Sequence, residues 1–394
     1  MQGKLIPRYN WDYGIGDLVK GIVSAFRPPE CAEKKLAEVF GEVPLLMTSG
    51  RSALFAILKA LELPSGAGVG VPLFCCPVVF EAIRFAGLTP IFIDIENDTY
   101  NMSHLDLGKK QNALSAVIVP HMFGHPANMD ALGSVAENLP MIEDCAQALF
   151  SKRNGRYVGF SATASFFSFR SGKYISAGEG SAIFCRESRL HGKIAAFIAS
   201  LEHWNTRQAI LSCINTYIKS TCYREPLYGL MGYSIGRRLD MRLNLTAKSG
   251  IRLRRIAASN LGIIGSRIST FETNVFRQIQ NARYLLSRIP ADCVVLPKQE
   301  SNCENNYFQF AVRFQTTTDR NNAAELLLRR GIDTAMYLDG IGHVAKTAFG
   351  YIGDCPVSES CASTILVIPH YYSLSQKQLE RISEGIIAVT KRRG

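Results

Sequence analysis

The sequence predicts an α/β protein with a largely parallel sheet, followed by a smaller α+β domain. The chain has 394 residues, 47% of them hydrophobic and 20% charged, which fits a globular protein with two domains. In the first half, short apolar strands alternate with helices over residues 69–71, 78–85, 91–95, 116–120, 129–137 and 141–143. This alternation favours helices on both faces of a parallel sheet, with a ligand site at the carboxyl ends of the strands.

The C-terminal third has the pattern of an α+β domain. A long helix is expected from about residue 271 to 288, a strand near 308–314, and helices over 321–330 and 375–389. No flexible linker precedes this part, so we expect it to pack directly on the rest of the chain.

A candidate phosphate site follows a mixed leading segment of residues 1–40. Thr48-Ser49-Gly50 leads into a helix expected over residues 51–61, whose apolar positions share one face. Free amides at such a helix start favour phosphate, and Gly50 lets the backbone approach it. Ser49 could equally be an N-cap, and the two roles are compatible.

The stretch 141–186 carries the strongest chemical signal. MIEDCAQALF reads as a short strand ending at Asp144, and FSFRSGKYISAGEG places Ser168 five residues before Lys173. A lysine in an apolar setting is a nucleophile, because burial disfavours the ammonium form. An acid, a hydroxyl and such a lysine are the parts needed to hold pyridoxal phosphate (PLP). Asp144 could instead cap the next helix. A nucleotide-binding loop around Lys173 is excluded, because Phe167 stands where that loop requires glycine.

These residues resemble the DegT/DnrJ/EryC1/StrS family of PLP-dependent sugar aminotransferases of fold type I. The resemblance runs from about Trp11 to Val389 and includes EDCAQALF, FSFRSGKYISAGEGSAIF, MTSGRSALFAILKALEL, VPLFCCPVVFEAIRFAGLTPIFIDIE, VIVPHMFGHPANMDAL and ILVIPHYYSLSQKQLERI. It implies a large PLP-binding domain over residues 1–250, with a mixed, mostly parallel seven-stranded sheet flanked by helices. Residues 186–250 would be a basic amphipathic insertion, and residues 251–394 the small C-terminal domain.

The resemblance also implies roles for individual residues. Lys173 would hold PLP as a Schiff base and move the proton, and Asp144 would pair with the pyridine nitrogen. Gln147 would lie near the phenolic oxygen of the ring. The phosphate would be held by Gly50, Arg51, Ser52 and Ser168. No metal is expected.

Two positions depart from the family pattern. Cys76 falls where the family places the aromatic residue that stacks on the ring, and Phe74 or Phe80 could supply that ring instead. Gly250 stands where the neighbouring subunit usually offers an asparagine, and Lys248 or Arg252 could replace that contact electrostatically.

His121 ends a predicted strand that faces the same site. We expect it to be a structural histidine bonded to a backbone carbonyl rather than a substrate contact.

The implied activity is amino transfer from an amino acid, Glu or Gln, to a nucleotide-linked or similar keto-sugar in polysaccharide or secondary-metabolite biosynthesis. The implied assembly is a homodimer with sites at the subunit interface. Two alternatives stay open. One is a PLP-dependent sugar lyase or dehydratase, although such relatives carry histidine in place of the lysine. The other is a non-catalytic relative that binds a membrane or a partner.

Residues 186–267 hold fourteen Lys or Arg against four acids, nearly the whole net charge of +11. Apolar residues at helical spacing lie within this stretch, at 194–204 and 210–222. They are expected to pack on the protein's own core or on a dimer partner. The competing hypothesis is peripheral contact with an anionic membrane. No nucleic-acid recognition motif accompanies the charge, so no nucleic-acid partner is expected.

The expected location is the cytoplasm, with possible attachment to the inner face of the membrane. No leader or membrane-spanning run is visible, and the eleven cysteines have irregular spacing, as in reduced proteins.

Overall fold

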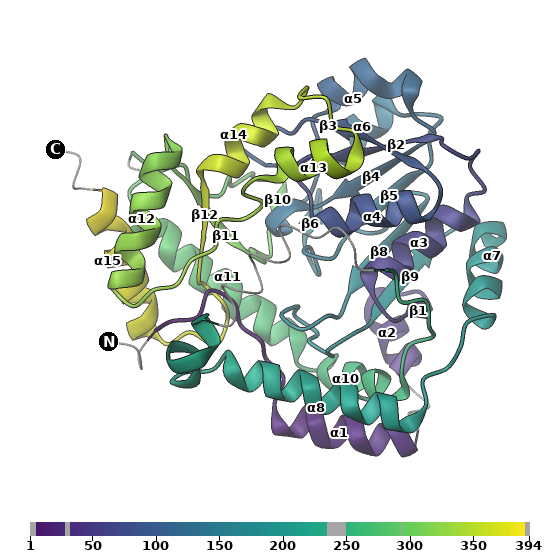
Figure 1. The fold of residues 1–394 in the computed structure, drawn as a ribbon, viewed down its shortest axis with the longest axis horizontal. Helices are drawn as coiled ribbons and strands as arrows, with labels where there is room; N and C mark the ends of the chain where they lie inside the picture. Colours follow the sequence, from purple (N-terminus) through teal and green to yellow (C-terminus); the bar gives the residue numbers. More distant parts are fainter. Residues whose placement is uncertain (1–4, 28–31, 235–249, 293, 391–394) are drawn as a thin grey trace.

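The computed structural model describes residues 5–27, 32–234, 250–292 and 294–390. Its centre is a seven-stranded sheet in the order β1-β9-β8-β5-β4-β2-β3 (Figure 1). These strands are β1 (Leu45–Met47), β2 (Gly68–Pro72), β3 (Thr89–Ile93), β4 (Ala116–Pro120), β5 (Met141–Asp144), β8 (Ala164–Ser168) and β9 (Ser181–Cys185). β2, β3, β4, β5 and β8 pair in parallel, whereas β9 is antiparallel to both β8 and β1. The predicted mixed, mostly parallel sheet of seven strands is therefore confirmed.

Strand alternation sends side chains to two faces of this sheet. Ile118 points into a core with the helices α3 (Gly50–Ala60), α4 (Pro77–Phe85) and α7 (Ser188–Ala199). Its neighbours Val117 and Val119 point to the other face, which is covered by α5 (His104–Lys110) and α6 (Met129–Val135). Since both faces are buried, the strands read as continuous apolar runs.

A third group of helices covers the β8–β9 end of the sheet. Phe167 and Phe184 pack there against Leu36 and Ile263. The helices involved are α1 (Ile15–Phe26), α2 (Ala32–Phe40), α8 (Thr206–Cys222) and α10 (Ala258–Arg267), with α1 lying alongside both α8 and α10 (Figure 1). The leading segment thus contributes two helices to the body of the large domain.

The C-terminal part has a core of its own around the antiparallel pair β11 (Phe310–Arg313) and β12 (Ile365–Ile368). Its helices are α11 (Phe271–Arg288), α12 (Thr317–Arg329), α13 (Ile341–Phe349), α14 (Pro356–Thr364) and α15 (Gln376–Thr390). α11 connects the cores, because Phe271 and Val275 pack on the β8–β9 side and Ala282 and Leu285 pack against β11 and β12. The expected division after residue 250 remains a prediction.

Short elements complete the described chain. A small sheet joins β6 (Lys152–Arg153) to β7 (Arg156–Tyr157) and β10 (Cys303–Glu304). Brief helical turns are η2 (Gln111–Ala113), η3 (Met122–Gly124) and η4 (Tyr228–Gly232). Among the described residues, no helix has the length and apolar character needed to cross a membrane.

The sequence-based helix and strand boundaries agree closely with these elements. The helix expected over 271–288 is confirmed at Phe271–Arg288, and the one expected over 51–61 begins and ends one residue earlier. These helices were predictable because an apolar stripe of period 3.6 follows a turn residue in each case.

Candidate active site

Asp144 is the last residue of β5, in the middle of the sheet. Its backbone pairs with Pro120 of β4 and Phe166 of β8, so its side chain emerges at the carboxyl ends of parallel strands. Burial raises the pKa of Asp144, while the amide of Ala146, 3.0 Å from Oδ1, and the charge of Lys173 act in the opposite direction. A buried carboxylate in this position is ready to pair with a cation.

Lys173 lies in the loop that connects β8 to β9. Gly172 and Gly178 adopt positive φ angles of 86° and 88°, which lets this loop turn without the strain a side chain would add. Burial lowers the pKa of Lys173 to about 7, and the charge of Arg170 acts in the same direction against the attraction of Asp144. Near neutral pH, the unprotonated, nucleophilic form is therefore far more populated than in a free lysine.

Phe308, just before β11, covers the amine from the C-terminal part of the chain. The Nζ of Lys173 lies 4.2 Å from the centre of the Phe308 ring. The face of the ring carries its negative side and therefore stabilises the ammonium. The sequence analysis did not single out Phe308, because nothing near it in the chain indicates that it meets Lys173.

The predicted phosphate cradle falls at the start of α3. Ser49 is the N-cap: its Oγ accepts from the amide of Ser52 at 3.2 Å, and the Oγ of Ser52 donates to the carbonyl of Ser49 at 2.8 Å. A Cβ on Gly50 would lie 3.3 Å from the Phe166 ring and 3.6 Å from the Cβ of Ser168. Gly50 and Ser168 are therefore neighbours at a helix N-terminus, which favours anions. The hydroxyl of Ser52 is fully buried in the capping turn.

The Arg51 side chain is engaged on α4. Its Nη1 lies 2.6 Å from Oε2 of Glu81, which is 7% exposed. This ion pair fixes the guanidinium beside the cradle. The signal for it in the sequence is Glu81, the one acid in the apolar helix that follows Cys76. A phosphate contact by Arg51 remains a prediction.

Both polar atoms of the Gln147 side-chain amide form hydrogen bonds. Its Oε1 accepts from the amide of Phe123 at 3.1 Å, and its Nε2 donates to the hydroxyl of Tyr337 at 3.0 Å. Burial raises the pKa of Tyr337, and the nearby thiols of Cys76 and Cys75 add to this effect. Tyr337 is a second residue that the sequence analysis missed.

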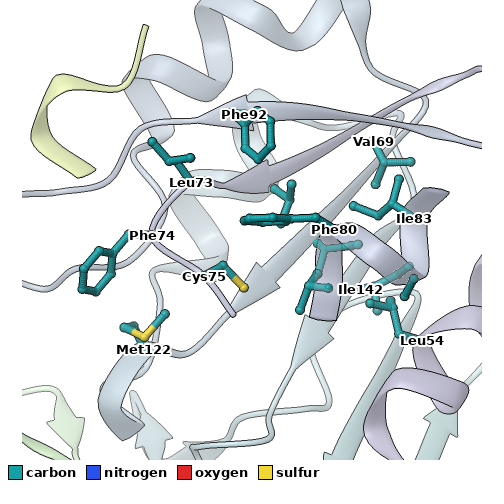
Figure 2. Packing of buried hydrophobic residues seen from close by; sticks show 14 of the residues in the cluster. Leu54, Val69, Leu73, Phe74, Cys75, Phe80, Ile83, Phe92, Met122 and Ile142 are labelled. Carbon is teal, nitrogen blue, oxygen red and sulfur yellow. The ribbon is translucent and has the colours of Figure 1, made fainter. Parts of the chain in front are cut away.

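Cys76 is exposed at the N-cap of α4, and it interacts electrostatically with Lys173. Phe74 and Phe80, the two residues considered as replacements for the stacking ring, are fully buried in the large core (Figure 2). Phe80 contacts the rings of Phe92 and Phe349, and Phe74 contacts Tyr337 at 6.1 Å. Tyr337 also lies near Cys76, whose thiol acts on the pKa of the Tyr337 hydroxyl.

His121 is a structural histidine, as expected, but its partners differ from the expectation. It is 1% exposed; its Nε2 lies 3.0 Å from Oε2 of Glu143 and its Nδ1 accepts from the amide of Ala127 at 3.0 Å. Burial opposes the charge of Glu143, but His121 and the amides of Gly159 and Ser161 outweigh it and lower the pKa of that carboxyl. The predicted bond from His121 to a backbone carbonyl is wrong, because the buried carboxylate of Glu143 beside it needs a hydrogen-bond donor.

A cleft opens beside Lys173, between the two parts of the chain. It is open to solvent. Its walls come from the segment before α1, the lysine loop and the ends of β11 and β12, through residues 8–10, 12, 172–174, 278, 308–309, 367–368 and 370–372. Such a cleft, next to a perturbed lysine, is a candidate substrate site.

The two apolar stretches of the basic segment differ in how far their side chains are buried. Ile194 is fully buried in the large core, and Phe197, Ile198 and Leu201 pack against it, as expected for core packing. On α8, Cys213 and Tyr217 pack inward, whereas Ile214 and Ile218 are exposed.

Part of the basic segment lies outside the described residues, namely Arg237, Arg238, Arg242 and Lys248. The remaining candidate for the missing asparagine, Arg252, has its Nη1 3.4 Å from Oε1 of Glu179. Gly250 is exposed, and no atom of the described residues lies within 4 Å of the position of a Cβ there.

This fold is that of the fold-type I aminotransferases. The solved structure of Spr1654 from Streptococcus pneumoniae in its PLP form superposes with a TM-score of 0.79 at 16% identity, covering 98% of this chain and 99% of that one. The chain belongs to the DegT/DnrJ/EryC1/StrS aminotransferase family, whose model matches residues 30–387.

Named relatives act on sugars. The UDP-N-acetyl-3-dehydro-alpha-D-glucosamine 3-aminotransferase of Acidithiobacillus ferrooxidans is 26% identical over 86% of this chain and 82% of that protein. The GDP-perosamine synthase of Escherichia coli O157:H7 is 37% identical over 154 residues, which are 38% of this chain and 42% of that protein.

Proposed function

We propose that this protein is a PLP-dependent aminotransferase that moves an amino group from Glu or Gln to a keto-sugar on a nucleotide or similar carrier. The products would enter polysaccharide or secondary-metabolite biosynthesis. The observation that carries the proposal is that Lys173, which lines the cleft, lies within electrostatic range of Asp144 at the carboxyl end of β5. The sugar named for each of the two relatives supports the substrate class.

The residues present fit PLP by the chemistry of their groups. Lys173 would hold the cofactor through Nζ, and Asp144 would pair with the ring nitrogen. The N-terminus of α3 at Gly50, together with Ser168, would hold the phosphate, since a helix start supplies amides without intrahelical acceptors. When bound, the cofactor supplies an electron sink for the carbon that loses its proton.

Lys173 is the proton carrier in this proposal. A group with a pKa of about 7 can accept and return a proton near neutral pH with little cost in either direction. Phe308 lies over Nζ and favours its protonated form. The carboxylate of Asp144 would stabilise positive charge on the ring nitrogen of the cofactor. Its surroundings are largely shielded from water, so its charge is weakly screened.

The sugar would bind in the cleft beside Lys173. The segment before α1 contributes Asp12, and the segment after β12 contributes Tyr371 and Tyr372. The hydroxyl of Tyr372 donates to the carboxylate of Asp12 across the cleft. Hydroxyl and carboxylate groups of this kind suit the hydroxyls of a sugar.

The proposal includes a homodimer with sites at the subunit interface. It is supported by the family to which the chain belongs, because the resemblance implies sites shared between two subunits. The proposed location is the cytoplasm, which agrees with the free thiols of the described cysteines.

The test is a two-stage reaction of the PLP-loaded protein. In the first stage, Glu and Gln are added separately, and the conversion of the bound cofactor to its amino form is followed by absorbance. In the second stage, a panel of nucleotide-linked keto-sugars is added, and aminated products are identified by mass spectrometry. Lys173→Ala is the control. A loaded protein that takes no amino group from any amino acid would contradict the proposal.

A further inference from the structure

Two neighbouring helices form an exposed surface that the proposed function does not use. α1 and α8 lie along one edge of the molecule (Figure 1) and pack together at Gly21, where a Cβ would lie 2.8 Å from Sγ of Cys213. Their inner sides are buried through residues such as Gly21 and Ser24 of α1 and Ala209 and Ser220 of α8. The opposite sides of both helices face solvent.

These outer sides are apolar. On α1 the exposed residues are Ile15, Val19, Val23 and Phe26, whose exposed fractions are 60%, 55%, 53% and 68%. On α8 they are Leu211, Ile214 and Ile218, at 54%, 37% and 56%. We call these seven residues the α1/α8 face. Their spacing puts each set on a single side of its helix, where a surface helix normally carries polar residues. A grouped exposed apolar surface indicates a binding site for a partner.

The exposed charges on α1 and α8 themselves are positive. Lys20 lies on α1, Arg27 caps its C-terminal end, and Arg207 and Lys219 lie on α8, all of them exposed. α8 has no acidic residue, and the one acid of α1, Asp17, is turned inward to Arg267, whose Nη2 lies 2.6 Å from its Oδ2. The face therefore combines an apolar centre with a cationic rim.

We propose that the α1/α8 face docks on an anionic lipid bilayer, with its apolar residues in the interfacial region and its basic residues at the headgroups. An apolar helix side flanked by Lys and Arg is the pattern of helices that lie in the plane of a membrane surface. The basic residues attract anionic headgroups over a distance set by salt.

The same charges disfavour a second copy of this chain as the occupant. A two-fold dimer through this face would bring the same patch of each subunit together, so one cationic rim would meet the other. A bilayer with anionic lipids instead offers an apolar layer to the apolar residues of the face and negatively charged headgroups to its basic residues. The inference does not depend on the proposed amino-transfer activity.

The test is flotation of the full-length, PLP-loaded protein with vesicles of phosphatidylcholine, with or without phosphatidylglycerol. We expect binding only when phosphatidylglycerol is present, and we expect added salt to weaken it. The variant Val19→Ser/Val23→Ser/Ile218→Ser removes apolar residues, and Lys20→Glu/Lys219→Glu reverses two charges. Each should reduce the bound fraction at least tenfold. Leu105→Ser, which removes a leucine on α5 that is 68% exposed, should bind like wild type.

Circular dichroism and analytical ultracentrifugation of each variant separate loss of binding from loss of fold or assembly. The proposal fails if wild type ignores phosphatidylglycerol vesicles at low salt. It fails also if wild type binds but both multiple variants bind equally well. If the serine variant changes only the oligomeric state, and wild type does not bind vesicles, a second copy covers the face and the proposal is overturned.

Discussion

Nζ of Lys173 lies 4.2 Å from the centre of the Phe308 ring, so an amine of the large domain is covered by an aromatic residue that precedes β11. This contact favours the protonated form of the lysine, while burial disfavours it more strongly. The balance between the two sets how much neutral amine is present at a given pH.

Phe308→Leu should lower the pKa of Lys173 further, because it removes the ring that stabilises the ammonium. A cation–π contact contributes about 0.5–2 kcal/mol, equivalent to a shift of about one pKa unit. The pH dependence of acylation of Lys173 in the cofactor-free protein, followed by mass spectrometry, should move to lower pH. Phe276→Leu, which changes an exposed ring on α11, is the matched control. An unchanged midpoint in Phe308→Leu would show that the ring does not act on the charge.

Lys173 should carry the cofactor. Borohydride reduction of the PLP-loaded protein should leave a pyridoxyl group on the peptide that contains Lys173 and Tyr174. Lys173→Ala should abolish amino transfer, because it removes the amine that holds the cofactor and moves the proton. It should leave the fold intact. Recovery of the label on another lysine would contradict the assignment of Lys173.

Burying this lysine should make stability depend on pH. The pKa is about 7 in the folded protein and near 10.5 in the unfolded chain, so the unfolded state binds more protons between these values. The free energy of unfolding should therefore rise with pH through this window, by up to about 1.4 kcal/mol per unit of pKa difference. Urea unfolding of the cofactor-free protein at pH 7 and pH 9 should show this rise relative to Lys173→Met. Parallel behaviour of the two proteins would contradict it.

The fold and much of the candidate site followed from local sequence signals. Lys173, Ser168, Gly50 and Asp144 stand in runs whose periodicity and turn residues locate them at strand ends and a helix start. Gly50 and Ser168 do meet, as the cradle hypothesis required. Phe308 and Tyr337 were not predicted, because they reach the site from segments more than a hundred residues away and no local pattern encodes such a contact.

The partners of charged groups were also hard to predict. The Arg51–Glu81 pair joins two helices 30 residues apart, and the partner of His121 is a buried acid on the neighbouring strand. The apolar stripe of α8 divides between an inner and an outer side, and which residues face solvent depends on where α1 lies.

Asp144→Asn should reduce the rate of amino transfer more than tenfold, which corresponds to about 1.4 kcal/mol or more in the barrier. The amide keeps the shape of the side chain but cannot stabilise positive charge on the ring nitrogen. Asp94→Asn is the matched control. Asp94 is also a buried acid at a strand end, and it accepts from the amides of Val357 and Ser358 at 3.0 and 2.8 Å, away from Lys173. That variant should lose stability while its rate per folded molecule changes little. Near-normal transfer in Asp144→Asn would mean that another group protonates the ring.

Glu143→Gln should destabilise the fold rather than act on the chemistry. The carboxylate of Glu143 is fully buried and accepts from Nε2 of His121 and from the amides of Gly159, Ser161 and Ala162 at 2.8–3.0 Å. A glutamine would present an amide group to some of these donors and leave them unpaired, and breaking such a buried network costs about 3–5 kcal/mol.

The pKa of Glu143 is lower in the folded protein than its ordinary value of 4.5. Its stabilisation is therefore full above that value and is lost as the pH falls through the lowered pKa, so wild type should approach the variant in acid. Urea unfolding at pH 7 and at a pH well below 4.5 measures both effects. Glu304→Gln, which changes an exposed acid paired with Lys152, should differ little from wild type at either pH. A Glu143→Gln protein as stable as wild type at pH 7 would show that this network does not hold β5 in place next to Asp144.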